Sequence, residues 1–516
     1  MRKIRKKTEN RILLLFLLFF AIIYPLYFRD GYTQITTYKY GFLKLISFSF
    51  GGVLLVIHMI SVVFPLKSTE GTIMPVHQRI GKLITGLSVT DWFVILYFFV
   101  LMISYFFSEF REEALWGTDG WYMGYVTQLI CIGIYFGVSR CYDGKGQRIW
   151  YLMIVTFLIF LWGLLNRFSI YPVNMENASP EFISSIGNIN WFCGYWSVFF
   201  GMGLVIYMMS EKTSTRICAG LYNAVALGLA AVEGSDSAFL SLSAVFLLLF
   251  FISFEKRRWL ERYLELFMIM CGSCQVFRLI HLIFPEQINF WNATIEFLLG
   301  NATFAIWIMA IILRVLIEDK EQETLPKKAH VVKWILIFMV AVFLIGYVIL
   351  MTINTKHPGS IGALSNKEIF IFNDMWGSAR GLTWKDGIII FNSLPGFKKW
   401  IGAGPDCFTA YAYHHPAISI MLENQFSGLR LTNAHSELIT LLVNTGVLGV
   451  VSFLGIFISS IVRLLKRALM NPICLICAVC AISYLIHNTF SFQQIVNTPF
   501  VFMMLGVGEN MLRKGE

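Results

Sequence analysis

The chain has 516 residues, of which 57% are hydrophobic and 14% are charged, and its formal net charge is +10. Soluble domains usually carry about 25% charged residues, so the polar side chains here are too few to cover a water-soluble protein of this length. The composition excludes an ordinary soluble enzyme and favours a protein whose solvent is lipid.

Apolar blocks recur along the whole chain, and each has about 17 to 25 residues, the length of a helix that crosses about 30 Å of hydrocarbon. They predict an all-α polytopic membrane protein with about fourteen transmembrane helices. Helices 1–11 fall within residues 1–353, a large loop occupies residues 354–434, and helices 12–14 fall within residues 435–516. The expected spans are residues 12–28, 41–65, 90–108, 121–139, 149–168, 190–209, 217–232, 237–254, 263–284, 296–317, 333–353, 436–462, 471–489 and 495–511.

The loops between these blocks alternate in charge. The N-terminal MRKIRKKTENR and every second loop are basic, whereas the intervening loops are acidic or nearly uncharged. Short cytoplasmic loops collect Lys and Arg, so we expect both termini in the cytoplasm. The first block lacks a small-residue cleavage site after it and is expected to remain as a helix. No basic soluble face is visible, so nucleic acid is not an expected partner.

Cysteines and histidines give no convincing metal site. The two cysteine sets with ligand-like spacing lie inside apolar helices without nearby His, Asp or Glu: Cys271 with Cys274, and Cys474 with Cys477 and Cys480. The adjacent His414 and His415 lack a third ligand. We therefore expect neither a metal nor another cofactor.

The loop at residues 354–434 is much longer than the other connections and contains many aromatic and aliphatic residues, unlike a disordered linker. We expect it to form a small helical cap at the outer face. Residues 378–393 predict an amphipathic helix, one face of which carries Arg380, Trp384, Ile388 and Phe391. A second, shorter helix is expected within residues 415–425.

The stretch RLTNAHSELITLLVNTGVLG, residues 430–449, changes from polar to apolar close to His435. Thr432 or Asn433 can cap a helix there, and Glu437 suits the positive end of its dipole. In a helical projection Glu437 lies on another face from the stripe that contains His435, Ile439, Leu442, Gly446 and Gly449. His435 should therefore point into the bundle. With an ordinary pKa of about 6.5 it can act as a general base, or it is an interfacial polar residue without a chemical role.

Arginines form a second group of candidates. Arg380 and Arg430 lie in the outer loop, while Arg278 and His281 lie one turn apart in the outer third of the ninth span. An ionisable residue inside a membrane is costly and usually functional, although Arg278 can also snorkel to the nearby surface. Guanidinium groups bind phosphate through a planar fork of donors, so arginines near one histidine indicate a phosphate-bearing ligand at the outer face.

Two polar segments at expected span ends each allow two interpretations. Asn188, in the GNIN sequence before the sixth span, can bond a sugar or can cap and pack the helix. Ser235-Asp-Ser237 separates the seventh and eighth spans, where it can bind a ligand or form a tight turn.

The ordered set of motifs resembles the O-antigen ligase and polymerase family of bacterial envelope glycosyltransferases. The matching motifs are Gly187-Asn-Ile-Asn190, Arg380 followed by Trp384, Gly402-Ala-Gly404 with Phe408, and Ala434-His435 followed by Leu438 and the helix with Gly446 and Gly449. The resemblance covers most of the chain, and the specific motifs lie mainly in residues 370–450. The chain departs from the family at Ser235-Asp-Ser237, where many members have Ser-Arg-Gly, and at Ser436, where Asn is common.

The resemblance implies a metal-independent enzyme with a C-type glycosyltransferase-like fold in the bacterial cytoplasmic (inner) membrane. The implied donor is an undecaprenyl-diphosphate-linked glycan, and the implied acceptor is a glycan or glycolipid hydroxyl. His435 would be the base and Arg380 would hold the diphosphate. The further substrate-binding candidates are Arg430, Arg278, His281, Trp384 and Asn188, and Arg278 or Arg430 could replace the arginine missing at Asp236.

A lipid-linked oligosaccharide flippase is the main alternative, because many such carriers also have about fourteen spans. Carriers commonly place paired ionisable groups near the midplane, and the expected spans hold few of them there. A non-catalytic membrane scaffold is a third possibility. The sequence leaves open the sugar, the acceptor, the oligomeric state and the choice between ligase and polymerase.

Overall fold

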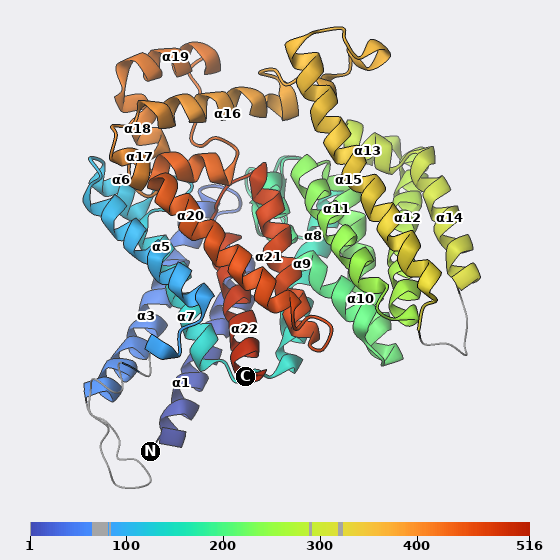
Figure 1. Ribbon diagram of the computed structural model, residues 1–516. Helices are drawn as coiled ribbons and strands as arrows, with labels where there is room; N and C mark the ends of the chain where they lie inside the picture. Colours follow the sequence, from blue (N-terminus) through green and yellow to red (C-terminus); the bar gives the residue numbers. More distant parts are fainter. Residues whose placement is uncertain (1, 64–80, 82–83, 288–291, 318–323, 516) are drawn as a thin grey trace.

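The computed structural model describes residues 2–63, 81, 84–287, 292–317 and 324–515. The basic loops expected around residues 67–82 and 320–333 lie largely or partly outside these residues. Long helices form a bundle, and a group of shorter helices covers one end of it (Figure 1). Both termini lie at the opposite end. We call these two ends the cap end and the termini end.

The long helices follow the apolar blocks. In chain order they are α1 (Arg2–Leu17), continued by η1 (Leu18–Ile23) and α2 (Tyr24–Leu26), then α3 (Ile35–Val63), α5 (Val89–Phe106), α7 (Tyr125–Cys141), α8 (Ile149–Arg167), α9 (Ile189–Met209), α10 (Thr213–Glu233), α11 (Asp236–Ser253), α12 (Arg257–Ile283), α14 (Asn301–Ile317), α15 (Lys327–Lys356), α20 (Glu437–Leu465), α21 (Pro472–Thr489) and α22 (Thr498–Gly515).

Short elements connect these helices or build the cap. The short helices are α6 (Arg111–Trp116), η2 (Gly146–Arg148), η3 (Pro285–Gln287), α13 (Ala293–Leu298), η4 (Gly362–Leu364), η5 (Glu368–Phe370), α16 (Trp376–Ser393), α17 (Lys398–Ile401), α18 (Phe408–His414) and α19 (Pro416–Phe426). The two-stranded antiparallel sheet pairs β1 (Phe182–Ile183) with β2 (Gly187–Asn188). The two helices expected in the large loop correspond to α16 and α19.

Within the described residues, 12 helices are long and apolar enough to cross a membrane. The protein is a nearly all-α, polytopic membrane protein, as the composition predicts. The expected fourteen spans are not all reached. The apolar helix α7 has only 17 residues, and α22 is less apolar because Glu509, Arg513 and Lys514 lie in it.

The break expected between the seventh and eighth spans is present. The helix α10 ends at Glu233, Gly234 adopts a left-handed φ of 66°, and Ser235 caps the N-terminus of α11. Glycine tolerates this backbone conformation without a steric cost. The two apolar helices are therefore separate elements joined by a tight turn.

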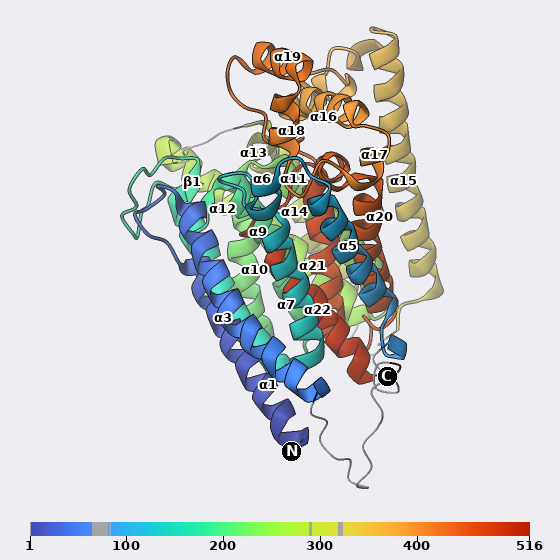
Figure 2. The same ribbon diagram turned by 90° about the vertical axis from the view of Figure 1, so that its left-hand side faces the viewer.

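Burial differs strongly between the centre and the edge of the bundle. Most residues of α9 are buried, and it packs so closely on α21 that a Cβ at Gly201 would lie 2.2 Å from the Val479 side chain. In contrast, α15 stands at one edge, as Figure 2 shows, and almost all of its apolar residues are exposed. Such a surface is suited to lipid rather than to water.

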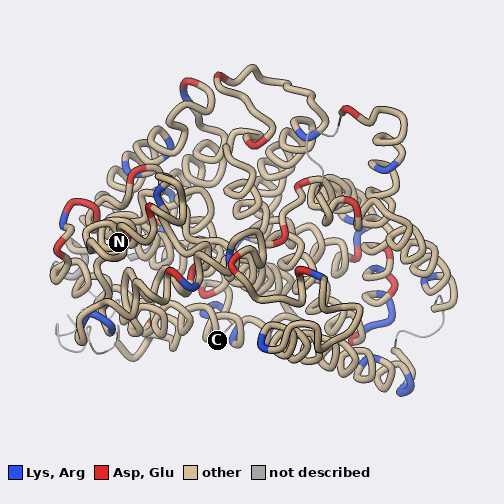
Figure 3. The backbone as a smooth tube through the Cα atoms, turned by 90° about the horizontal axis from the view of Figure 1, so that it is seen from above, with Lys and Arg blue, Asp and Glu red and all other residues tan. Residues whose placement is uncertain are grey.

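A network of buried charges holds the termini end together. Asp91 of α5 accepts from Arg140 of α7 at 2.9 Å and also pairs with Arg513 of α22. Glu509 pairs with Arg463 of α20 at 2.5 Å and with Arg513 at 3.1 Å. Viewed from above, Lys, Arg, Asp and Glu are scattered along a chain that is largely uncharged (Figure 3).

Candidate functional site

His435 lies in a turn immediately before α20. Its φ is 49°, in the left-handed region that residues other than glycine rarely adopt, and its N–H donates to Asn433 Oδ1 at 2.9 Å. Because α20 begins only at Glu437, the expected helical stripe through His435 is wrong. Strained backbone at a non-glycine residue is frequent at functional sites, where surrounding contacts hold it in place.

The expected stripe is also wrong at Gly446, which interrupts α20 with φ 67° and ψ −170°. Backbone groups next to this break bond the chain after α17: Ala403 N donates to Val443 O and Gly404 N donates to Asn444 O, both at 2.9 Å. A Cβ at Gly446 would come within 2.4 Å of the α17 backbone. Gly446 therefore marks a close approach, but the partner is the cap rather than a second transmembrane helix.

Arg380 is held at the start of the regular part of α16. The three residues before it, 377–379, have left-handed φ values of 62°, 60° and 67°. Arg380 Nη1 donates to Gly377 O at 2.6 Å, and Nε donates to Phe490 O at 3.0 Å. Trp384 follows one turn later, 5.5 Å from the Phe490 ring, and its indole Nε1 has no hydrogen-bond partner in the described structure. Arg380 and Trp384 thus both contact Phe490, which lies in the loop between α21 and α22.

That loop, between α21 and α22, also contacts His435. Phe492 packs edge-on against the imidazole, with ring centroids 5.6 Å apart and an interplanar angle of 83°. The next residue, Gln493, donates its backbone N–H to Glu437 Oε2 at 2.5 Å. Residues 490–493, which we call the bridging loop, therefore bring Arg380 and His435 together.

The surroundings of these two residues set their charge. Part of the His435 surface is exposed, so a ligand can reach it, yet protein atoms crowd the ring. Desolvation by these surrounding atoms, and secondarily the Arg380 charge, lowers the pKa of His435 to about 4. Burial also lowers the pKa of Arg380, an effect that the Asp236 charge opposes. At neutral pH the site therefore combines a neutral imidazole with a guanidinium cation.

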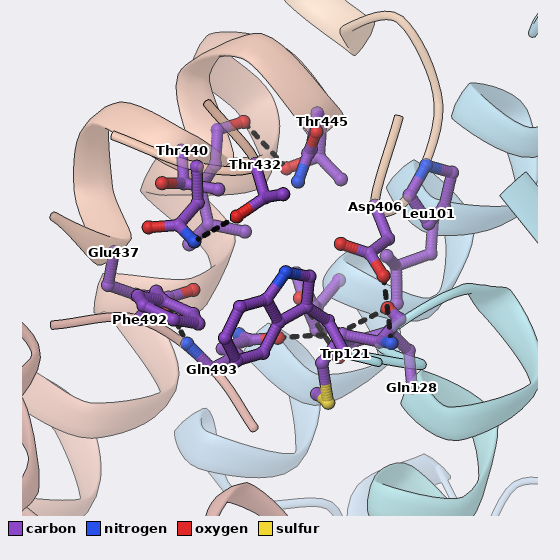
Figure 4. Close-up of a pocket in the computed structure, with 16 residues that line it drawn as sticks. Leu101, Trp121, Gln128, Asp406, Thr432, Glu437, Thr440, Thr445, Phe492 and Gln493 are labelled. Carbon is purple, nitrogen blue, oxygen red and sulfur yellow. Dashed lines mark hydrogen bonds between the residues drawn. The ribbon is translucent and has the colours of Figure 1, made fainter. Parts of the chain in front are cut away.

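A small cavity of about 30 Å³, lined by both polar and apolar groups, lies next to this turn, between the cap and the bundle (Figure 4). Its wall includes Asn433, Glu437, Phe492, Trp121 and Asp406, and none of its lining residues is Lys, Arg or His. Figure 4 places Glu437 and Asp406 on opposite sides of the cavity. The cavity thus has two carboxyl groups and no cationic side chain in its wall.

Asp406 ties the cap to the loop before α7. Its Oδ2 accepts the backbone N–H groups of Thr118 and Met123, both at 2.9 Å. Burial raises the pKa of Asp406 to about 7, although the two N–H donors favour the charged form. Between residues 118 and 123 lies Trp121, which packs edge-on against Phe492 at 4.7 Å.

The other predicted binding residues make their contacts elsewhere. Arg278 Nη2 donates to Asn301 Oδ1 at 2.8 Å, which ties α12 to α14. His281 follows one turn later in α12, a helix on the opposite side of the bundle from α5 (Figure 1). Arg430 is exposed and stacks over Tyr413 at 5.4 Å. Asn188 caps α9 by accepting from Asn190 N at 2.9 Å. Substrate binding by these four residues stays a prediction.

Sequence reasoning misses three features of this region. It assigns Glu437 to another face because the helical projection begins two residues too early, and it passes over Asp406 because this residue follows no helical pattern. It also overlooks His487, which is buried near the end of α21 and pairs through Nδ1 with Asn488 Oδ1 at 2.9 Å. An ionisable residue in an apolar span is the signal that would have found His487.

Comparison with known proteins adds no identification. No protein-family model matches the chain, and no curated protein matches it. The functional interpretation therefore rests on the motifs and on the geometry of the site.

Proposed function

We propose that the protein is a metal-independent membrane glycosyltransferase of the O-antigen ligase or polymerase type. It moves a glycan from undecaprenyl diphosphate to an acceptor hydroxyl at the outer face of the bacterial cytoplasmic membrane. The observation that carries this proposal is the convergence of Arg380 and His435 on the bridging loop, at one end of a bundle of apolar helices.

The chemistry requires one base and one group that stabilises negative charge. His435 accepts the proton of the acceptor hydroxyl, whose oxygen then bonds to the anomeric carbon of the donor sugar. The bond from that carbon to the diphosphate oxygen breaks, and its electron pair leaves with the lipid diphosphate. Arg380 stabilises this charge. A lowered pKa keeps His435 unprotonated at neutral pH, as a base requires.

An apolar groove supports a donor with a lipid tail. It has a volume of about 370 Å³ and lies between α11 and α15, with a wall formed by Ala244, Leu247, Leu248, Phe251, Ile337, Val340, Ala341 and Leu344. The helix α11 begins at Asp236, whose charge acts on Arg380. A tail in this groove would lie below a diphosphate bound at Arg380.

A row of aromatic rings that begins at Phe492, which contacts His435, supports a sugar acceptor. Phe492 contacts Trp121 at 4.7 Å, and Trp121 contacts Trp191 at 5.8 Å. Weakly positive C–H groups of a sugar ring are attracted to the negative face of an aromatic ring. The row also explains how the GNIN segment, which precedes Trp191, is connected to the site.

The charge at the termini end supports the proposed orientation. The N-terminal residues are rich in Lys and Arg, and the C-terminal Arg513 and Lys514 lie at the same end of the bundle. The positive-inside rule places this end in the cytoplasm and the cap outside.

Reconstitution of the purified protein separates this proposal from the flippase alternative. Proteoliposomes containing an undecaprenyl-diphosphate-linked glycan and a glycolipid acceptor should form the transferred product. The lipid-linked glycan should not cross the bilayer faster than in empty liposomes. Translocation without transfer would favour a flippase, and neither activity would favour a scaffold, so both results contradict the proposal.

A further inference from the structure

The bridging loop is buried, although connections between helices usually lie at the surface. The residue that follows the loop is held by nearby residues of the same segment, because Gln494 N donates to Asn497 Oδ1 at 3.1 Å and to Thr498 Oγ1 at 3.0 Å. The backbone of Gln493 instead depends on another element, since its N–H donates to the carboxyl group of Glu437 at the start of α20. Glu437 thus anchors the loop to the helix that follows His435.

The Gln493 backbone lies close in sequence to the residues that contact His435 and Arg380. Gln493 directly follows Phe492, whose ring contacts His435, and lies three residues after Phe490, whose carbonyl accepts from Arg380. A shift of the Gln493 backbone would therefore move both contacts. The Gln493 side chain is held separately, because Gln128 Nε2 donates to its Oε1 at 2.5 Å.

Stability alone is a poor explanation for Glu437. Its side chain is only 3% exposed, and no Lys, Arg or His lines the cavity that it faces. Burial of a carboxyl group without a cationic partner costs free energy. At this position an apolar residue could fill the space, but it could not accept the Gln493 N–H.

We propose that Glu437 is a positioning residue that holds the bridging loop so that Arg380 and His435 act on the same substrate. This inference rests on the proposed function. Glu437 itself does not touch the reacting atoms. It acts through its hydrogen bond to Gln493 N, and this bond sets the positions of the Phe490 carbonyl and the Phe492 ring.

Two substitutions separate the hydrogen bond from the ionisable carboxyl group. Glu437→Gln keeps an acceptor oxygen of the same reach, whereas Glu437→Leu removes it. We expect kcat of Glu437→Gln to stay within about threefold of the wild type and kcat of Glu437→Leu to fall by about 10- to 100-fold, since a misplacement of about 1 Å can cost about 100-fold. The donor KM should rise in the Leu variant as well, because Arg380 loses its fixed acceptor.

The pH profile supplies a readout that a general loss of stability would not produce. When the loop loosens, Arg380 and the atoms that crowd His435 move away from the imidazole. The acid limb of the pH–rate profile should therefore move to a higher pH in Glu437→Leu. The limb should not move in Glu437→Gln. Asp386→Leu is a matched control, because it removes a buried carboxyl group of the cap that faces Gln425 rather than the bridging loop.

All variants are compared as full-length protein in proteoliposomes, with melting temperature as the measure of folding. If Glu437→Leu does not fold, Glu437→Asp replaces it, because the side chain is one methylene shorter and cannot reach Gln493 N from the same backbone. The inference would be overturned if kcat fell equally in Glu437→Gln and Glu437→Leu. It would also be overturned if Glu437→Leu, or Glu437→Asp in its place, kept the kcat and the pH profile of the wild type. An inactive wild type would instead overturn the proposed function.

Discussion

Two pairs of buried carboxyl groups, one pair at each end of the helix bundle, are held in different ways. At the termini end, Asp91 and Glu509 are paired with arginines from neighbouring helices. At the cap end, Asp406 and Glu437 face a cavity without a cationic lining residue, and they accept backbone N–H groups instead. Arg380 likewise donates to two backbone carbonyl groups.

This contrast separates stability from function. A paired charge is satisfied by its partner and leaves little free energy for a substrate, whereas Arg380, which is held by backbone carbonyl groups, keeps its positive charge for a ligand. We therefore expect substitutions at the cap end to reduce transfer more than folding, and substitutions at the termini end to do the reverse.

The largest effect is expected at His435. Asparagine tolerates the left-handed backbone at this position, so His435→Asn should fold with an almost unchanged melting temperature. It lacks the base, and transfer should fall by about 100- to 10,000-fold. Product formation in purified membranes, normalised to folded protein, measures this change. Transfer at the wild-type rate would remove His435 from the mechanism.

A smaller loss is expected at Arg380. Arg380→Lys retains a positive charge but cannot donate to both Phe490 O and Gly377 O from one planar group, so diphosphate binding should weaken. The donor KM should rise by about tenfold, equivalent to about 1.4 kcal/mol. Arg111→Lys is the matched control, because Arg111 also donates to a backbone carbonyl, Phe106 O, and its donor KM should stay within about twofold. A larger rise for Arg111→Lys than for Arg380→Lys would contradict the role of Arg380.

At the termini end, Asp91→Asn should affect folding rather than transfer. The change leaves Arg140 and Arg513 without their shared carboxylate. We expect a loss of about 2–3 kcal/mol in stability, less than for a fully buried pair because both arginines are partly exposed. A lower melting temperature with unchanged transfer per folded molecule supports the contrast between the ends. Loss of transfer without loss of stability would contradict it.

The last prediction concerns the pH dependence of stability rather than transfer. The pKa of Asp406 is raised to about 7 in the folded protein, compared with about 3.9 in an unfolded chain. Between these values the folded state binds more protons, so the contribution of Asp406 to stability decreases as the pH rises from about 4 to 7. Asp406→Asn removes this titration. Its melting temperature relative to the wild type should therefore increase over that range, and a constant difference would contradict the raised pKa.

Hydropathy predicts most of the long helices because a bilayer demands apolar residues and internal backbone hydrogen bonds. The helical period also places Arg380 and Trp384 correctly on one side of α16. The same period fails at His435, since a left-handed residue precedes the helix, and at Gly446, where the approach of α17 interrupts it. Glu437 and Asp406 contact segments distant in sequence, and no local pattern encodes such contacts.

The central claim is that Arg380 and His435 act at one site, and a double-mutant cycle tests it most directly. The measurement is kcat/KM for glycan transfer by the wild type, Arg380→Ala, His435→Asn and the double variant, each in proteoliposomes of the same composition. If the residues act as a unit on one substrate, the double variant should be little worse than the more damaged single variant. Losses that simply multiply would show that the two residues act independently and would contradict the account.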